Sequence, residues 1–238
     1  MTRVTARSRL LDIGWALFTN LFVLAGVMLW GWPPGNVFVL FWIENVILGV
    51  VTAVRIGSAQ GVPAADPNAR TSGIAPRWVA VGFFSFHYGV FALVHGVFVG
   101  IVAASIGVVP GMWTLVLPGL LIALRYVVEL ATVWFLGGQR RHISAAQALA
   151  APYPRLFVLH IVTLIGFTAV LPAASRRDGF LSGILRTVQG WFATLDLTIS
   201  TGAALVALLM LAKTIADLLL IARVGKPLHL RIGGRSIG

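Results

Sequence analysis

NVFVLFWIENVILGVVTAVRI, residues 36–56, is the stretch that decides the class of this protein. It contains one acid, Glu44, and one base, Arg55, in an otherwise mostly apolar run. A helix of this length extends for roughly 30 Å at 1.5 Å per residue, which matches the hydrocarbon core of a bilayer. The stretch therefore predicts a transmembrane helix that carries a carboxylate inside the membrane.

The rest of the chain has the composition of a membrane protein. Of its 238 residues 58% are hydrophobic and 11% are charged, and the mean hydropathy is +0.94. Soluble domains are roughly 45–50% apolar and about 25% charged, so a soluble enzyme, a disordered chain and a fibrous repeat are excluded. The absence of cysteine excludes disulfides, thiolate metal sites and a cysteine nucleophile.

The predicted fold class is all-α, a polytopic transmembrane helical bundle that forms one domain over residues 1–238. Six windows are long and apolar enough to cross the membrane, at about 10–30, 36–56, 78–104, 112–136, 155–171 and 198–222. Between the fifth and sixth spans, apolar residues recur at helical spacing over residues 179–196. This pattern predicts an amphipathic helix in the outer interface, with a short helix that caps the bundle as the alternative.

The basic residues predict the orientation of these spans. The net charge of +11 would suggest nucleic acid for a soluble chain, but here the bases lie mostly between apolar spans, so no nucleic-acid partner is expected. Thirteen of the eighteen bases fall on one side of the predicted bundle, which the positive-inside rule places in the cytoplasm. We expect a multi-pass protein of the inner (plasma) membrane, in contact with the lipid bilayer, with both termini cytoplasmic.

Ionisable side chains within the spans are the main functional signal. Each costs roughly 2.5–3.5 kcal/mol on insertion scales, so such groups usually face the bundle interior. Counted from the cytoplasmic end of each span, four of them come out near the midplane: Glu44, His87, Arg125 and Lys213. A second layer nearer the cytoplasm contains Glu129, His160 and Asp217, whereas His95 comes out near the outer face. We expect the two layers to meet in one interior pocket.

Two pairs of these charges have a simpler interpretation. Arg125 with Glu129 and Lys213 with Asp217 each have i, i+4 spacing, so each pair can neutralise itself on one helix. Glu44 has no base within a helical turn. It is therefore expected to be protonated, paired across helices or bound to a cation.

At these residues the sequence resembles an uncharacterised family of bacterial and archaeal membrane proteins, domain of unknown function 6498. The motifs are Phe41-Trp42-Ile43-Glu44-Asn45, the double-histidine segment 83–96, Arg155 with His160, and Lys213-x-x-x-Asp217. The resemblance implies a multi-span membrane protein and brings no activity. Four further candidate site residues lie in these motifs: Asn45, Tyr88, His95 and Arg155. Tyr88 and His95 are seven residues apart, so they share a helix face.

The first functional hypothesis is a membrane-embedded, metal-dependent enzyme, such as a hydrolase of a lipid or a membrane peptide. Carboxylates and imidazoles suit a divalent metal such as zinc, whose bound water has a pKa of about 7. The candidate metal ligands are Glu129, His160, Asp217 and His87. The catalytic candidates are Glu44, His87, Arg125 and Lys213, the two cations stabilising developing negative charge. No compact ligand motif is present, so these ligands would have to converge from separate spans.

The second hypothesis is a proton- or ion-coupled transporter of a small anionic solute. Glu44 and His87 would exchange protons, and Arg125 or Lys213 would bind the anion. Six spans would then require a homodimer. Two further alternatives are a haem held between His87 and His160, or between His95 and another histidine, and a protein whose polar groups only hold its helices together.

Overall fold

A computed structural model of the chain describes residues 6–61, 77–170, 180–194 and 199–223. This part of the chain consists of helices and their connections and contains no strand, as the sequence predicts. Residues 112–136 form one continuous helix, in which α4 lies between the π-helical segments η1 and η2. The elements are α1 (Ala6–Leu29), α2 (Pro34–Ser58), α3 (Arg77–Ile106), η1 (Met112–Val116), α4 (Leu117–Glu129), η2 (Leu130–Leu136), η3 (Gln139–Arg141), α5 (Ala145–Ala150), α6 (Tyr153–Val170), α7 (Phe180–Ala193) and α8 (Thr201–Arg223).

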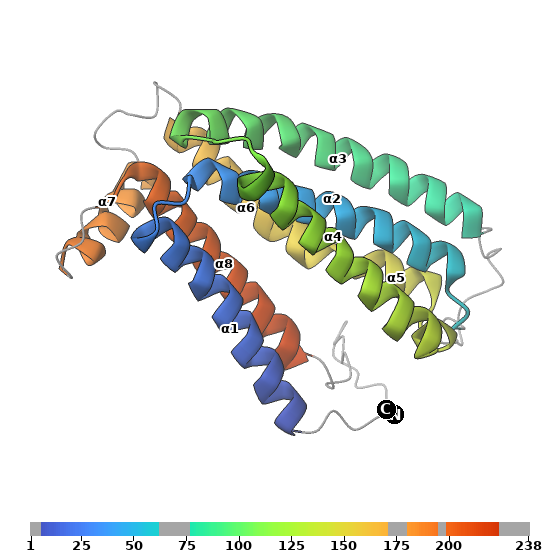
Figure 1. Cartoon of the computed structure of the whole chain (residues 1–238). Coiled ribbons are helices and arrows are strands. Elements are labelled where there is room, and N and C mark those ends of the chain that lie inside the picture. Colours follow the sequence, from blue (N-terminus) through green and yellow to red (C-terminus); the bar gives the residue numbers. More distant parts are fainter. Residues whose placement is uncertain (1–5, 62–76, 171–179, 195–198, 224–238) are drawn as a thin grey trace, which may run out of the picture.

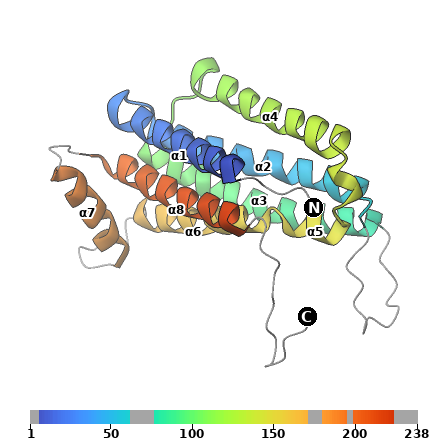
Figure 2. The ribbon, with the colours of Figure 1, turned by 90° about the horizontal axis from the view of Figure 1, so that it is seen from below.

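Helix α2 lies at the centre of the bundle. It packs against α3, α4, α5, α6 and α8, and successive long helices run in opposite directions (Figure 1). Helices α1 and α8 lie side by side, and α6 connects this pair to α3 (Figures 1 and 2). The main hydrophobic core lies where α2, α3, α6 and α8 meet, around Phe38, Val102, Val162 and Leu205.

Four helices of the described chain are long and apolar enough to cross a membrane. They are Pro34–Ser58, Arg77–Ile106, Met112–Leu136 and Thr201–Leu218. The apolar part of α1 is shorter, Leu17–Leu29, and α6 has 18 residues. All six predicted windows thus coincide with helices, although among the described residues only these four helices have the length and polarity of a span. Large apolar side chains are exposed along α3, among them Phe83, Phe86 and Leu93, as expected of a surface that faces acyl chains.

The start of α2 is fixed against the loop that follows α3. Pro34 stands in the first turn of α2, where its missing N–H costs nothing. The N–H of Gly35 donates to the carbonyl of Gly107 at 2.8 Å, an approach that a Cβ at Gly35 would block. The buried amide of Asn36 donates to the carbonyl of Val109 and accepts from its N–H, both at 2.9 Å. These contacts hold the helix that begins at residue 112 beside α2.

The connection before α6 shifts that helix along the bundle. It folds into the short helix α5, whose start is closed by a capping box between Ser144 and Gln147. Helix α5 packs against α2 and α3 near the end of the bundle where α3 begins (Figure 1). The first residue of α6 therefore lies part-way along α3 and not beside the first residue of α3. This offset determines which histidines of the two helices meet, as described below.

Helix α7 covers most of the segment predicted to form an amphipathic helix. It packs against α8 and α6, and Val188 contacts the core. Trp191, by contrast, is exposed. The helix itself is confirmed over Phe180–Ala193, and its position in the interface stays a prediction.

Candidate functional site

A small pocket between α2, α4 and α8 brings together two of the four residues predicted at the midplane, Glu44 and Lys213. Its volume is about 10 Å³, close to what a single water molecule needs. Asp217, which we expected one layer nearer the cytoplasm, lines the same pocket. The lining residues are Phe41, Glu44, Asn45, Leu48, Tyr126, Lys213, Ala216 and Asp217.

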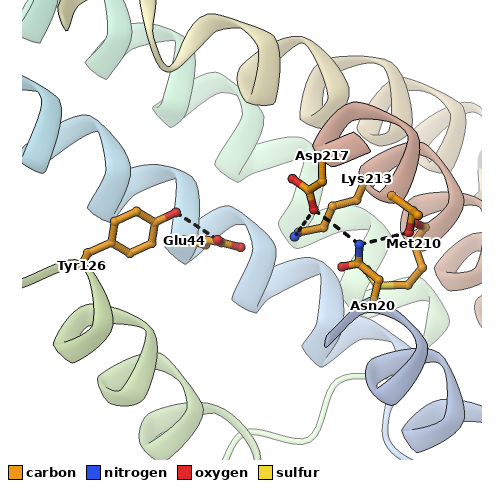
Figure 3. Close-up of polar contacts among 7 residues, drawn as sticks. Asn20, Glu44, Tyr126, Met210, Lys213 and Asp217 are labelled. Carbon is orange, nitrogen blue, oxygen red and sulfur yellow. Dashed lines mark hydrogen bonds and ion pairs between the residues drawn. The ribbon is translucent and has the colours of Figure 1, made fainter. Parts of the chain in front are cut away.

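Tyr126 holds the carboxylate of Glu44 from the opposite wall. Its hydroxyl donates to Oε1 of Glu44 at 3.0 Å, and the tyrosine is only 2% exposed (Figure 3). This bond joins α4 to α2 across the pocket. Sequence reasoning missed Tyr126, although a signal was available: it follows Arg125 and so lies at the same predicted depth as Glu44.

The other wall carries the ion pair that the spacing of α8 predicts. Nζ of Lys213 lies 3.2 Å from Oδ2 of Asp217 (Figure 3). Asn20 of α1, which is 3% exposed, donates to Oδ2 of Asp217 at 3.4 Å and to Oγ1 of Thr214 at 3.0 Å. With Glu44 and Asp217 ionised and Lys213 protonated, the pocket has a formal charge of −1.

Asn45 and Tyr88 connect the pocket to α3. The amide of Asn45 donates to the carbonyl of Phe41 at 2.8 Å, while its buried Oδ1 has no hydrogen-bond partner among the described residues. The hydroxyl of Tyr88 donates to the backbone carbonyl of Asn45, also at 2.8 Å. The ring of Tyr88 packs where a side chain at Gly49 would clash, so these two candidates belong to the α2–α3 interface.

His87 lies elsewhere, against our expectation. It is exposed, and its ring stacks on Phe83 at 5.7 Å between centroids and lies 6.5 Å from the ring of Tyr153. Each residue of a helix is rotated by about 100° from the one before, so when Tyr88 faces α2, His87 faces outward. The predicted Glu44–His87 centre is therefore not formed.

Arg125 and Glu129 do not pair along their helix. Arg125 is exposed, with its guanidinium 5.6 Å from the ring centre of Tyr126. Glu129 accepts instead from Nη2 of Arg55 at 2.9 Å, which joins the end of α4 to the end of α2. The guanidinium of Arg55 also lies 5.6 Å from the ring centre of Trp134. Packing against α2 thus overrides the i, i+4 spacing.

His95 and His160 form a direct pair, although the sequence predicts them at different depths. Nε2 of His95 lies 2.6 Å from Nδ1 of His160. His95 is about 27 Å from the start of α3, but His160 is only about 11 Å from the start of α6, and the insertion of α5 makes up the difference. The side chain of Arg155 lies outside the described residues.

Comparison with known proteins identifies the family to which the chain belongs. Residues 2–230 match the family of unknown function DUF6498. The chain belongs to this family. No curated protein and no solved structure matches it. The resemblance drawn from the sequence motifs is confirmed, and DUF6498 membership assigns no activity.

The metal ligands proposed for this DUF6498 protein do not converge. Each of the four contacts a different residue. Glu129 contacts Arg55 and Asp217 contacts Lys213. His160 contacts His95, and His87 stacks on Phe83. In the described ranges, no three histidine, aspartate or glutamate residues lie close enough to hold a metal ion. The structure thus gives no support to the predicted zinc centre.

The pairs of histidines proposed to hold haem do not fit it either. The two ring nitrogens of His95 and His160 are in direct contact at 2.6 Å. Metal–imidazole bonds of about 2.0 Å would set two ligands on opposite sides of a metal about 4 Å apart. His87 is exposed and its ring lies beside Phe83 and Tyr153, whereas His160 contacts His95.

Proposed function

We propose that this DUF6498 protein is a proton-coupled transporter of a small anionic solute, in which Glu44 carries the proton. The observation that carries the proposal is the shared pocket, where a carboxylate from α2 lies beside the Lys213–Asp217 ion pair of α8. Ionisable groups at membrane depth typically mark ion or proton pathways. The metal-dependent enzyme has no comparable assembly of residues among those described.

The charges of the pocket explain how proton and anion would be coupled. With Glu44 ionised the pocket carries −1, and this charge repels an anion in a medium of low dielectric constant. Protonation of Glu44 leaves the neutral Lys213–Asp217 pair, whose ammonium can then accept an anion. Each ligand therefore favours the other, which is the reciprocity that symport of a proton and an anion requires.

Opening of the pocket requires movement, because its present volume suits about one water molecule. Helix α4 is the element best placed to move, since α2 is the long helix against which it chiefly packs. The Tyr126–Glu44 bond closes the gap between these two helices. We infer that protonation of Glu44 weakens this bond and allows α4 to swing away from the pocket, since a neutral carboxyl is a poorer acceptor.

The proposed setting is the inner membrane, with six spans and α7 in the outer interface. Arg55, Arg77, Arg140 and Arg141 lie at the ends of α2 and α3 and in η3, at one end of the bundle (Figure 1). The positive-inside rule assigns this end to the cytoplasm, and both termini with it. A homodimer would complete the wall of a transport path that six helices enclose only in part.

Uptake into proteoliposomes tests this function. We expect an inward proton gradient to drive accumulation of at least one labelled anion from a set of phosphate, succinate and glutamate. A protonophore should abolish accumulation, because the proton supplies the driving force. Two results would contradict proton coupling: accumulation that persists after the protonophore is added, and uptake of the anion without acidification of the vesicle interior.

A further inference from the structure

We propose that His95 and His160 form a second proton-binding site, which holds a single proton between α3 and α6. This inference rests on the geometry of the two imidazoles and is independent of the Glu44 pocket. His95 is 2% exposed, its Nδ1 lies 2.8 Å from the carbonyl oxygen of Phe91, and its Nε2 lies 2.6 Å from Nδ1 of His160.

These contacts fix the position of every ring proton in the pair. A carbonyl oxygen can only accept, so the proton of His95 lies on Nδ1. A neutral imidazole carries one N–H, so Nε2 of His95 must be an acceptor, and Nδ1 of His160 must be the donor to it. In the neutral pair, Nε2 of His160 is therefore the nitrogen left with a free lone pair for a proton.

Uptake of this proton strengthens the hydrogen bond between the two rings. A proton passes from hydronium to Nε2 of His160, and water is released. The imidazolium still donates through Nδ1 to His95, now in a charge-assisted bond. Phe91 stacks on His95 at 3.9 Å and lies 5.5 Å from the ring of His160, within the range of a cation–π contact of about 6 Å.

A second proton has no place in the pair. It would have to bind Nε2 of His95, which would turn the acceptor of the short bond into a donor. Two N–H groups would then point at each other across 2.6 Å. The pair is thus limited to one proton, which distinguishes it from two independent histidines.

Other described charges nearby are engaged elsewhere. On α2, Glu44 accepts from Tyr126 and Arg55 pairs with Glu129; on α8, Lys213 and Asp217 pair with each other. Helix α5 has no ionisable side chain. The remaining titratable groups on α3, α6 and α7 whose side chains are described are exposed or have other contacts: Arg77, His87, Tyr88, Tyr153 and Arg186. The charge of the pair therefore depends mainly on its own proton.

Nitrogen NMR of the full chain in lipid nanodiscs tests the site. The variant H87Q/H142Q/H229Q keeps only the two histidines of the pair, so every imidazole signal belongs to it. Between about pH 4 and pH 9, a range that covers ordinary histidine titration, we expect Nε2 of His160 alone to gain a proton. Nε2 of His95 should stay unprotonated and show a scalar coupling to Nδ1 of His160 across the N–H···N bond.

The same chain with the added change His160→Gln is the matched control. It removes the receiving nitrogen, so we expect no imidazole to take up a proton in this range. Three results would overturn the proposal: a pair that stays neutral throughout, which is a purely structural bond; uptake of two protons; or proton uptake by His95 in the control.

Discussion

Replacing Lys213 with methionine is expected to destabilise the folded protein by up to about 3–5 kcal/mol, the cost of removing one partner of a fully buried ion pair. The side chains of Lys213 and Asp217 are 21% and 13% exposed, so water screens them little. Without the ammonium, the carboxylates of Asp217 and Glu44 remain in one pocket with no described cation lining it. The free energy of unfolding in mixed detergent micelles measures this loss.

The double variant Lys213→Met/Asp217→Asn should recover most of that stability. It removes the uncompensated carboxylate and keeps an oxygen that can accept from Asn20. Arg125→Met is the matched control, because this cation also lies at the predicted midplane but is exposed. Its effect should be within about 0.5 kcal/mol. Equal unfolding free energies for Lys213→Met and the native chain would show that the ion pair does not stabilise the pocket.

Glu44→Gln is expected to abolish proton-driven accumulation of the solute, with a fall of at least about 100-fold, typical of removing a proton-transfer group. Glutamine resembles the protonated carboxyl in shape and charge, so the pocket stays able to bind an anion. Exchange of labelled for unlabelled solute across the membrane should therefore continue, since it needs no net movement of protons. Transport assays in both modes separate these two effects.

Two conservative variants sharpen this prediction. Glu44→Asp keeps an ionisable group and should retain coupled uptake at a reduced rate. Tyr126→Phe removes the 3.0 Å hydrogen bond to Glu44 but no titratable carboxyl, and coupling should persist. Loss of exchange as well as accumulation in Glu44→Gln, in a protein that remains folded, would mean that Glu44 binds the solute rather than the proton.

The helices of the bundle follow from the sequence because their cause is local. Long apolar runs, Pro34 at the start of α2 and the short polar connections determine where each helix lies along the chain. The i, i+4 pair of Lys213 and Asp217 is likewise contained in one helix, and the structure forms it. Depth along a span was enough to predict that Glu44 and Lys213 meet.

The rest of the site depends on how each helix is rotated about its axis and how far it is shifted along the bundle. The sequence pattern of a single helix determines neither. His87 and Tyr88 are adjacent, yet the orientation of α3 turns one outward and buries the other. Depth counted from span ends placed His95 and His160 far apart, because it assumed that every helix begins at the membrane surface. The short helix α5 breaks that assumption, since α6 begins deeper in the bundle.

Infrared difference spectroscopy of the reconstituted protein tests the central claim most directly, namely that Glu44 exchanges a proton inside the pocket it shares with Lys213 and Asp217. A step from high to low pH should produce a carboxylic acid C=O band of Glu44, which subtraction of the Glu44→Gln spectrum separates from the bands of the other six acids. We expect this band to be present in the native chain and in Asp217→Asn, and absent in Glu44→Gln. A band that survives Glu44→Gln unchanged, or vanishes only in Asp217→Asn, would contradict the account.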